Sequence, residues 1–106
     1  MKLFINRTRS NIEAQAEYLP EEGTFTVLKG SKISGVIAYT EKFRGSKSIE
    51  KSRAGVVDGN VVTKNVTFKS ASTAANFVTG SSTNGRTAWK DANGKKLKDI
   101  LADKEA

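Results

Sequence analysis

Two stretches of this chain concentrate the residue types that bind phosphate. Residues 42–53 hold five basic side chains against one carboxylate, and residues 80–98 hold another five against one. In the second stretch Trp89 stands between Arg86 and Lys90, where a ring can stack on a base while its neighbours hold phosphates. If the two stretches meet in the folded chain, they form a surface for a polyanion. The predicted nucleic-acid-binding residues are Lys29, Lys32, Lys42, Arg44, Lys47, Asn84, Arg86, Trp89, Lys90 and Lys95.

Each of these residues also has a structural interpretation, and both interpretations stay open at this point. Trp89 is the single tryptophan of a small chain, and such a residue usually packs in the core. The pair Asn84-Gly85 is first of all a turn, and only secondarily a place where Asn84 reads a base edge. Residues 29–32, Lys-Gly-Ser-Lys, can cradle a phosphate but lack the spacing of a nucleotide-binding loop. Basic residues also simply keep small domains soluble.

The composition excludes most catalytic and metal sites. The chain has no cysteine and no histidine, which removes thiolates, disulfides, the commonest metal ligand and the commonest general base. The 11 acidic residues are scattered, and the adjacent Glu21 and Glu22 belong to an expected solvated turn. We therefore expect no enzyme activity, no cofactor and no metal. The net charge of +7 instead favours an acidic partner.

The length predicts one domain over residues 1–106, because a chain of 106 residues has the usual size of a single core. Apolar runs are short, as at residues 35–39, so no segment offers the roughly 20 apolar residues that span a bilayer. Residues 1–5 begin like a secretory leader, but polar residues follow at once. We expect a cytoplasmic protein.

The N-terminal half reads as strands. Hydrophobic and polar residues alternate over residues 12–18, the pattern of a strand with one wet face. Pro20 to Gly23 predict a turn, and residues 24–28 a second strand, so the two form a hairpin. Residues 33–39 are rich in β-branched and aromatic types, although Gly35 leaves their state open.

The second half mixes helices and strands. Residues 49–57 fit a helix that ends before Gly59, while Asp58-Gly59 can equally make a hairpin turn. Residues 61–68 suit a strand, or two short pieces broken near residues 64–65. A helix follows, capped by Ser70 or Ser72 and ended by Gly80, and its first amides could also meet an external phosphate. A last short helix starts near Lys96. The expected fold is α+β, a mainly antiparallel sheet with two or three short helices packed on it.

A combination of motifs carries most of the sequence information. It runs from Phe68-Lys69-Ser70-Ala71-Ser72-Thr73-Ala74-Ala75 through Val78-Thr79-Gly80 to Asn84-Gly85-Arg86, Trp89-Lys90 and Gly94, with Phe25-Thr26-Val27-Leu28-Lys29-Gly30-Ser31 upstream. In this combination the chain resembles the family called domain of unknown function 4357, over roughly residues 12–101. That family often has proline where this chain has Ala71, at the first helical position. The pattern is also similar to the RAMA domain, which is associated with restriction enzymes and adenine methylases.

The resemblance implies a context more than a mechanism. Such domains are often joined to GIY-YIG-type nucleases or to proteins of restriction systems, which makes DNA the implied partner. We therefore expect a non-enzymatic nucleic-acid-binding or DNA-sensing accessory module of a nuclease or restriction-type system. The alternative is a protein–protein interaction domain that docks a nuclease or restriction partner without touching DNA.

Overall fold

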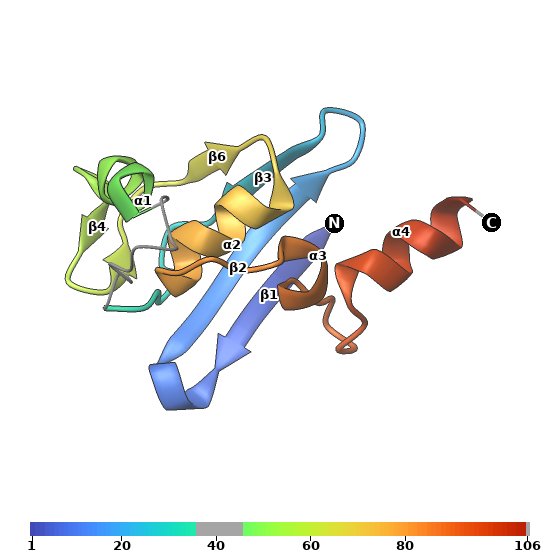
Figure 1. The fold of residues 1–106 in the computed structure, drawn as a ribbon, viewed down its shortest axis with the longest axis horizontal. Coiled ribbons are helices and arrows are strands. Elements are labelled where there is room, and N and C mark those ends of the chain that lie inside the picture. The colour runs from blue at the N-terminus through green and yellow to red at the C-terminus, as the bar shows by residue number, and fades with distance from the viewer. Residues whose placement is uncertain (36–45, 106) are drawn as a thin grey trace.

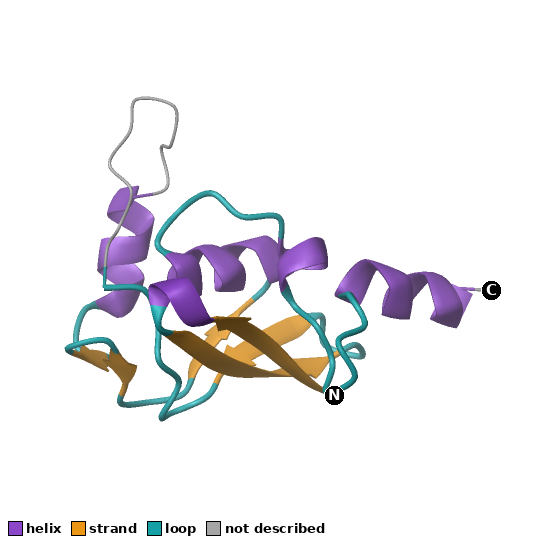
Figure 2. Ribbon diagram, turned by 90° about the horizontal axis from the view of Figure 1, so that it is seen from below, coloured by secondary structure: helices purple, strands orange, loops and turns teal. Residues whose placement is uncertain are grey.

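The computed structural model describes residues 1–35 and 46–105, which build an antiparallel sheet with helices on one face (Figures 1 and 2). The sheet has the strand order β1-β2-β3-β6, and all neighbours are antiparallel. Its strands are β1 (Lys2–Arg7), β2 (Ile12–Leu19), β3 (Thr24–Val27) and β6 (Val66–Phe68). The other elements are η1 (Thr8–Ser10), α1 (Ser46–Arg53), β4 (Val57–Asp58), β5 (Val61–Val62), α2 (Ala71–Thr79), α3 (Gly85–Ala88) and α4 (Leu97–Glu105). This arrangement confirms the predicted α+β class.

The predicted β2–β3 hairpin is present. Alternate residues of β2 are buried, from Ile12 to Tyr18, because they face the helices, while the residues between them face away from the core. Tyr18 pairs with Phe25 across the hairpin, and the two rings stack with centroids 4.4 Å apart and planes 5° apart. The hairpin thus supplies the centre of the sheet and an aromatic pair under the helices.

β1 was not predicted, because its polar residues looked like the interruption of a leader. Leu3 and Ile5 are both buried, so the strand alternates in the same way as β2. The carbonyl of Met1 accepts a hydrogen bond from the N–H of Tyr18. In this antiparallel register, the backbone N–H and C=O groups of the odd-numbered residues of β1 bond to β2, and those of the even-numbered residues point to the outer edge of the sheet. On that outer edge Phe4 exchanges two backbone hydrogen bonds with Lys90, at 2.7 and 3.0 Å.

The middle of the chain uses both of the alternatives that its sequence left open. The helix exists, but α1 ends at Arg53, and Gly55 follows with φ at 76°. The prediction that this helix continues through Val57 was wrong, because Val57 pairs with Val62 in a two-stranded hairpin around Gly59. A left-handed glycine two residues after Arg53 leaves the helix no way to continue. Of residues 33–39, those from 36 onward lie outside the described residues, while Ile33 is buried.

The helix α2 begins and ends where its sequence predicts. The hydroxyl of Ser70 accepts from the N–H of Thr73, and Gly80 closes the helix with φ at 76°. Between these caps Ala74, Ala75 and Val78 are buried against the sheet. The predicted break between residues 61–62 and 66–68 and the short helix near Lys96 are also confirmed. No helix in the described ranges is long and apolar enough to cross a membrane.

Ala71→Pro is expected to stabilise the protein by about 0.4–1 kcal/mol, because proline restricts the unfolded chain more than alanine does. Ala71 is the first residue of α2, where no helical hydrogen bond uses the backbone N–H. Ser70 already has the extended backbone that a residue before proline prefers, with φ at −146° and ψ at 150°. Urea unfolding followed by far-UV circular dichroism measures the change, and a lower midpoint in the variant would contradict this reading of the helix start.

Candidate nucleic-acid interface

Trp89 belongs to the core. Its side chain has 0% of its surface exposed, and its indole N–H donates a hydrogen bond to the carbonyl of Ala71 at 3.0 Å. A base cannot stack on a fully buried ring, so the inclusion of Trp89 among the nucleic-acid-binding residues was wrong. The alternative of a buried anchor is confirmed. The aromatic group between Arg86 and Lys90 is therefore a structural one.

The residues of the Ser-x-Ser and Asn-Gly-Arg motifs meet at one joint between α2 and α3. The N–H of Gly85 donates to the hydroxyl of Ser72 at 3.2 Å. A Cβ on Gly85 would overlap the backbone of Ala71 and lie only 2.5 Å from the nitrogen of Ser72, so only glycine fits there. We call Ala71, Ser72, Gly85 and Trp89 the α2–α3 joint. The close packing and the hydrogen bonds of this joint explain why the sequence has serine, glycine and tryptophan at these positions of the two motifs.

Asn84 is a helix cap rather than a simple turn residue. Its side-chain oxygen accepts from the N–H of Arg86 at 3.0 Å, and α3 starts at Gly85. This short helix was not predicted. Asn84 is exposed, but its side-chain oxygen is already engaged at the start of α3.

Residues 29–32 do not form a phosphate cradle. The N–H of Lys29 donates to the side chain of Asn65, and those of Gly30, Ser31 and Lys32 donate to backbone carbonyls. The hydroxyl of Ser31 accepts from the N–H of Gln15 and is buried. The cradle interpretation was therefore wrong, because every amide that it needs already donates a hydrogen bond within the fold. Lys29 and Lys32 contribute exposed ammonium groups only.

The two basic stretches do not gather on one surface. Figure 1 places α1 at one end of the molecule, whose longest extent is 39 Å, and away from α3 and the turn before α4, which carry most of the second stretch. Lys42 and Arg44 lie outside the described residues, and for Lys47 only the helical backbone is described. Arg53 serves the fold, because its guanidinium donates to the carbonyls of Phe77 and Ser34. The premise that the stretches converge is not met among the described residues.

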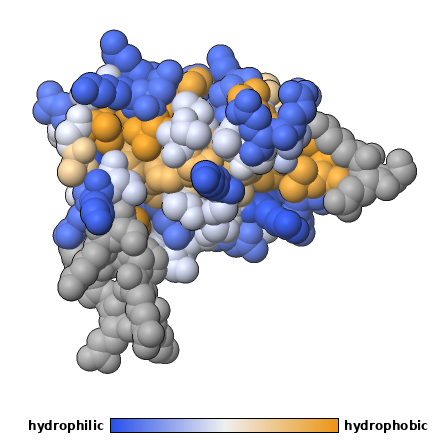
Figure 3. Space-filling model, turned by 90° about the horizontal axis from the view of Figure 1, so that it is seen from above, coloured by the Kyte–Doolittle hydropathy of each residue, from blue (hydrophilic) through white to orange (hydrophobic). Residues whose placement is uncertain are grey.

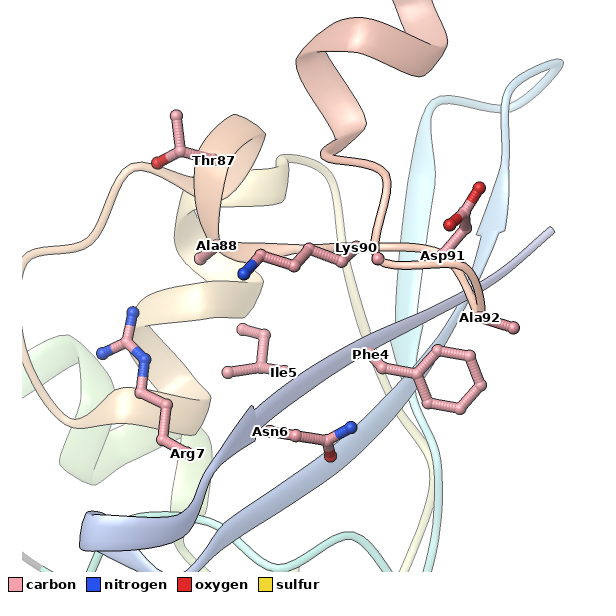
Figure 4. Close-up of a pocket in the computed structure, with 10 residues that line it drawn as sticks. Phe4, Ile5, Asn6, Arg7, Thr87, Ala88, Lys90, Asp91 and Ala92 are labelled. Atoms are coloured by element: carbon pink, nitrogen blue, oxygen red, sulfur yellow. The ribbon is translucent and has the colours of Figure 1, made fainter.

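The C-terminal stretch meets β1 instead. A groove of about 510 Å³ lies between β1 and residues 87–94, with Ile5 and Ala88 in its lining. Figure 4 shows the side chains of Arg7 and Lys90 extending toward the same space in this groove. The pairing of Phe4 with Lys90 sets this geometry, because it places residue 90 directly beside the first strand.

One carboxylate shares the groove with these cations. Asp91 accepts hydrogen bonds from the N–H groups of Asn93 and Lys95, each at 2.9 Å, so it holds the turn that follows Lys90. In the same turn Lys90 pairs with Lys96 as an isolated bridge. Lys95 is therefore placed by a tight hairpin close to the groove, although it does not line it.

A second hollow of about 450 Å³ adjoins the groove on the open face of the sheet. It shares Phe4, Asn6 and Arg7 with the groove and adds Lys32. Glu13 also lines it and approaches the ammonium group of Lys32 to 3.9 Å. We call Phe4, Asn6, Arg7, Lys32 and Lys90 together the β1 surface. Arg7, Lys32 and Lys90 give it three cations, with Glu13 and Asp91 as the nearest lining carboxylates.

Three residues of the β1 surface, Phe4, Asn6 and Arg7, were missed in the sequence. The signal was present, because the buried residues Leu3 and Ile5 alternate with Phe4 and Asn6, which face the other side of the sheet. We interpreted the segment instead as a secretory leader interrupted by polar residues. Arg86, in contrast, was predicted next to Lys90 and lines a different pocket beside the start of α2. The predicted site therefore divides into two separate places.

The fold is a small α+β domain with a groove beside β1 that Arg7, Lys90 and Asp91 line, and no cluster among residues 1–35 and 46–105 could hold a metal ion. The model of the family described as domain of unknown function (DUF4357) matches residues 3–101. The chain belongs to this family. Neither a curated protein nor a solved structure matches it.

Proposed function

We propose that this protein is a non-enzymatic, cytoplasmic nucleic-acid-binding module that contacts the phosphate backbone through the β1 surface. The observation that supports this most is the meeting of Arg7 and Lys90, from opposite ends of the chain, over one groove. Guanidinium and ammonium groups held on a common surface bind neighbouring phosphates, and the net charge of +7 attracts a polyanion from a distance. DNA is the partner that the resemblance to this family implies.

Phe4 gives this surface an aromatic group that Trp89 cannot provide. Its side chain is partly exposed and lines both hollows, beside the outward-facing amide of Asn6. Stacking of a base on an aromatic ring contributes about 1–3 kcal/mol in single-stranded complexes. The combination of Phe4 with flanking cations therefore favours a single strand or a distorted duplex over an intact one.

The double variant Arg7→Gln/Lys90→Gln is expected to lose affinity for single-stranded and duplex DNA without losing its fold. Removal of two phosphate contacts lowers the log–log salt slope on duplex by about 1.8. Fluorescence anisotropy with labelled DNA over a salt series measures both quantities. The matched control is Lys64→Gln/Lys69→Gln, which removes the same charge beside β6 at the other edge of the sheet. Equal losses in both variants would show that only net charge matters and would reject the β1 surface.

The outer edge of β1 supports a second candidate function, the docking of a partner protein. Asn6 is the next outward residue after Phe4, and its backbone N–H and C=O make no hydrogen bond in the described part of the chain. An extended segment of a partner, such as a nuclease or restriction-system protein, can add there as a further strand. Negligible DNA binding of the unmodified protein at low salt would favour this function over the first.

A further inference from the structure

A separate pocket of about 270 Å³ lies at the N-terminus of α2. Tyr18 and Phe25 of the central hairpin and Leu97 and Leu101 of α4 give it an apolar wall. Residues 70–72 and the side chain of Arg86 form its polar end. Figure 3 shows hydrophobic side chains at the end of the molecule where α4 lies, bordered by hydrophilic ones. The pocket is slightly smaller than the roughly 300–1,000 Å³ of most small-molecule sites.

The polar end carries positive potential from two sources. The N–H groups of Ala71 and Ser72 make no hydrogen bond within the described residues, because they belong to the open first turn of a nine-residue helix. Arg86 is exposed and forms no ion pair among the described residues. None of the lining residues is acidic. An anion would therefore meet amides and a guanidinium without a competing carboxylate.

The hydroxyl of Tyr18 is the independent observation that points to a ligand. Tyr18 has only 8% of its surface exposed, yet its hydroxyl has no hydrogen-bond partner in the described structure. Every fully buried side-chain N or O atom among the described residues has a hydrogen-bond partner. The hydroxyl of Tyr18 has none, so it must keep some accessible surface. Tyr18 lines the pocket, and its ring is fixed by the stack on Phe25. Because the ring is held in place and the hydroxyl keeps accessible surface, the hydroxyl is free to donate a hydrogen bond to a ligand in the pocket.

We propose that this pocket binds a phosphate monoester, with the phosphate at the start of α2 and the organic part on the apolar wall. Arg86 neutralises the phosphate, the first-turn amides and the Tyr18 hydroxyl donate hydrogen bonds to it, and Phe25 and Leu101 contact the organic part. The same group comes from two sources, a free nucleotide or the 5′-phosphate end of a nucleic-acid strand. The pocket lies apart from Arg7 and Lys90, so its test is independent of the β1 surface.

Amide NMR on the intact chain tests the proposal with four probes: inorganic phosphate, a nucleoside 5′-monophosphate, a short 5′-phosphorylated oligonucleotide and the same oligonucleotide with a 5′-hydroxyl. We expect saturable shifts of the Ala71 and Ser72 amides with the phosphate monoesters. Arg86→Gln should raise Kd about tenfold or more, and Tyr18→Phe, which preserves the ring, about threefold to tenfold. Lys64→Gln, the matched loss of one exposed cation beside β6, should leave Kd unchanged.

The probes also separate the two sources. Tighter binding of the 5′-phosphorylated oligonucleotide than of its 5′-hydroxyl twin supports a strand end as the ligand, and tighter binding of the nucleotide than of either oligonucleotide supports a free nucleotide. Two outcomes overturn the proposal. One is the absence of shifts at residues 71 and 72 with every probe, and the other is an unchanged Kd in both Arg86→Gln and Tyr18→Phe.

Discussion

Gly85→Ala is expected to destabilise the protein by at least about 3 kcal/mol, a large fraction of the stability of a small domain. The added Cβ would overlap the backbone of Ala71 and Ser72, and a backbone cannot rotate away as a long side chain can. Relief of the overlap would move α3 off α2 and break the hydrogen bond from Gly85 to Ser72. Urea unfolding followed by circular dichroism measures the loss.

Gly94→Ala is the matched control for this substitution. Gly94 has φ at 83°, but a Cβ there has no atom within 4 Å, so only backbone strain of about 1–2 kcal/mol is expected. The conformation of Gly85, in contrast, is not left-handed, and its cost is steric. Similar losses in the two variants would mean that the close contact between α2 and α3 does not hold in solution.

Trp89→Ala is expected to cost about 3–5 kcal/mol, because removal of the largest fully buried side chain of the described residues leaves a cavity in the core. Trp89→Phe should cost less, although it still leaves the carbonyl of Ala71 without its indole donor. Chemical denaturation followed by circular dichroism ranks the variants by their free energy of unfolding. The single tryptophan of the unmodified protein should also emit at the short wavelengths of a dry environment and shift to longer ones on unfolding.

The stacking interpretation of Trp89 makes the opposite prediction. On that interpretation Trp89→Phe would keep the fold and the stability unchanged and lose only DNA affinity. A folded Trp89→Ala variant with an unchanged midpoint would show that this side chain does not anchor the core. Binding assays on any Trp89 variant are therefore informative only after its stability is known.

The elements that the sequence predicts well are those whose signals are local. α2 has its cap at Ser70, its small buried residues at helical spacing and its left-handed end at Gly80, all within one short window. The β2–β3 hairpin likewise combines alternation with a proline- and glycine-containing turn. In both cases the backbone hydrogen bonds close within the segment or with its direct neighbour, so the chain itself contains the necessary information.

The elements that were missed depend on distant partners. β1 is stabilised by β2 on one edge and by Lys90 on the other, and its own residues show only a weak alternation. α3 is four residues long and exists because Gly85 fits against the start of α2. The bond between Gly85 and Ser72 joins residues 13 positions apart, and no periodic pattern in either segment indicates it.

The candidate site divides for the same reason. Arg86 and Lys90 are four positions apart, but Trp89 enters the core between them, so the two cations serve different pockets. Arg7 joins Lys90 only through the pairing of the chain ends, which charge counting cannot reveal. The charge composition thus predicted an acidic partner, but only the fold shows where each cation lies.

The pairing of Phe4 with Lys90 has a consequence for biosynthesis. A ribosome makes β1 well before the segment that covers its outer edge. Until residues 89–97 leave the exit tunnel, the nascent chain keeps that edge open and Trp89 is missing from the core. The domain therefore completes its fold only after residues 89–97 have emerged, and the removal of either β1 or residues 89–97 leaves the other without its partner.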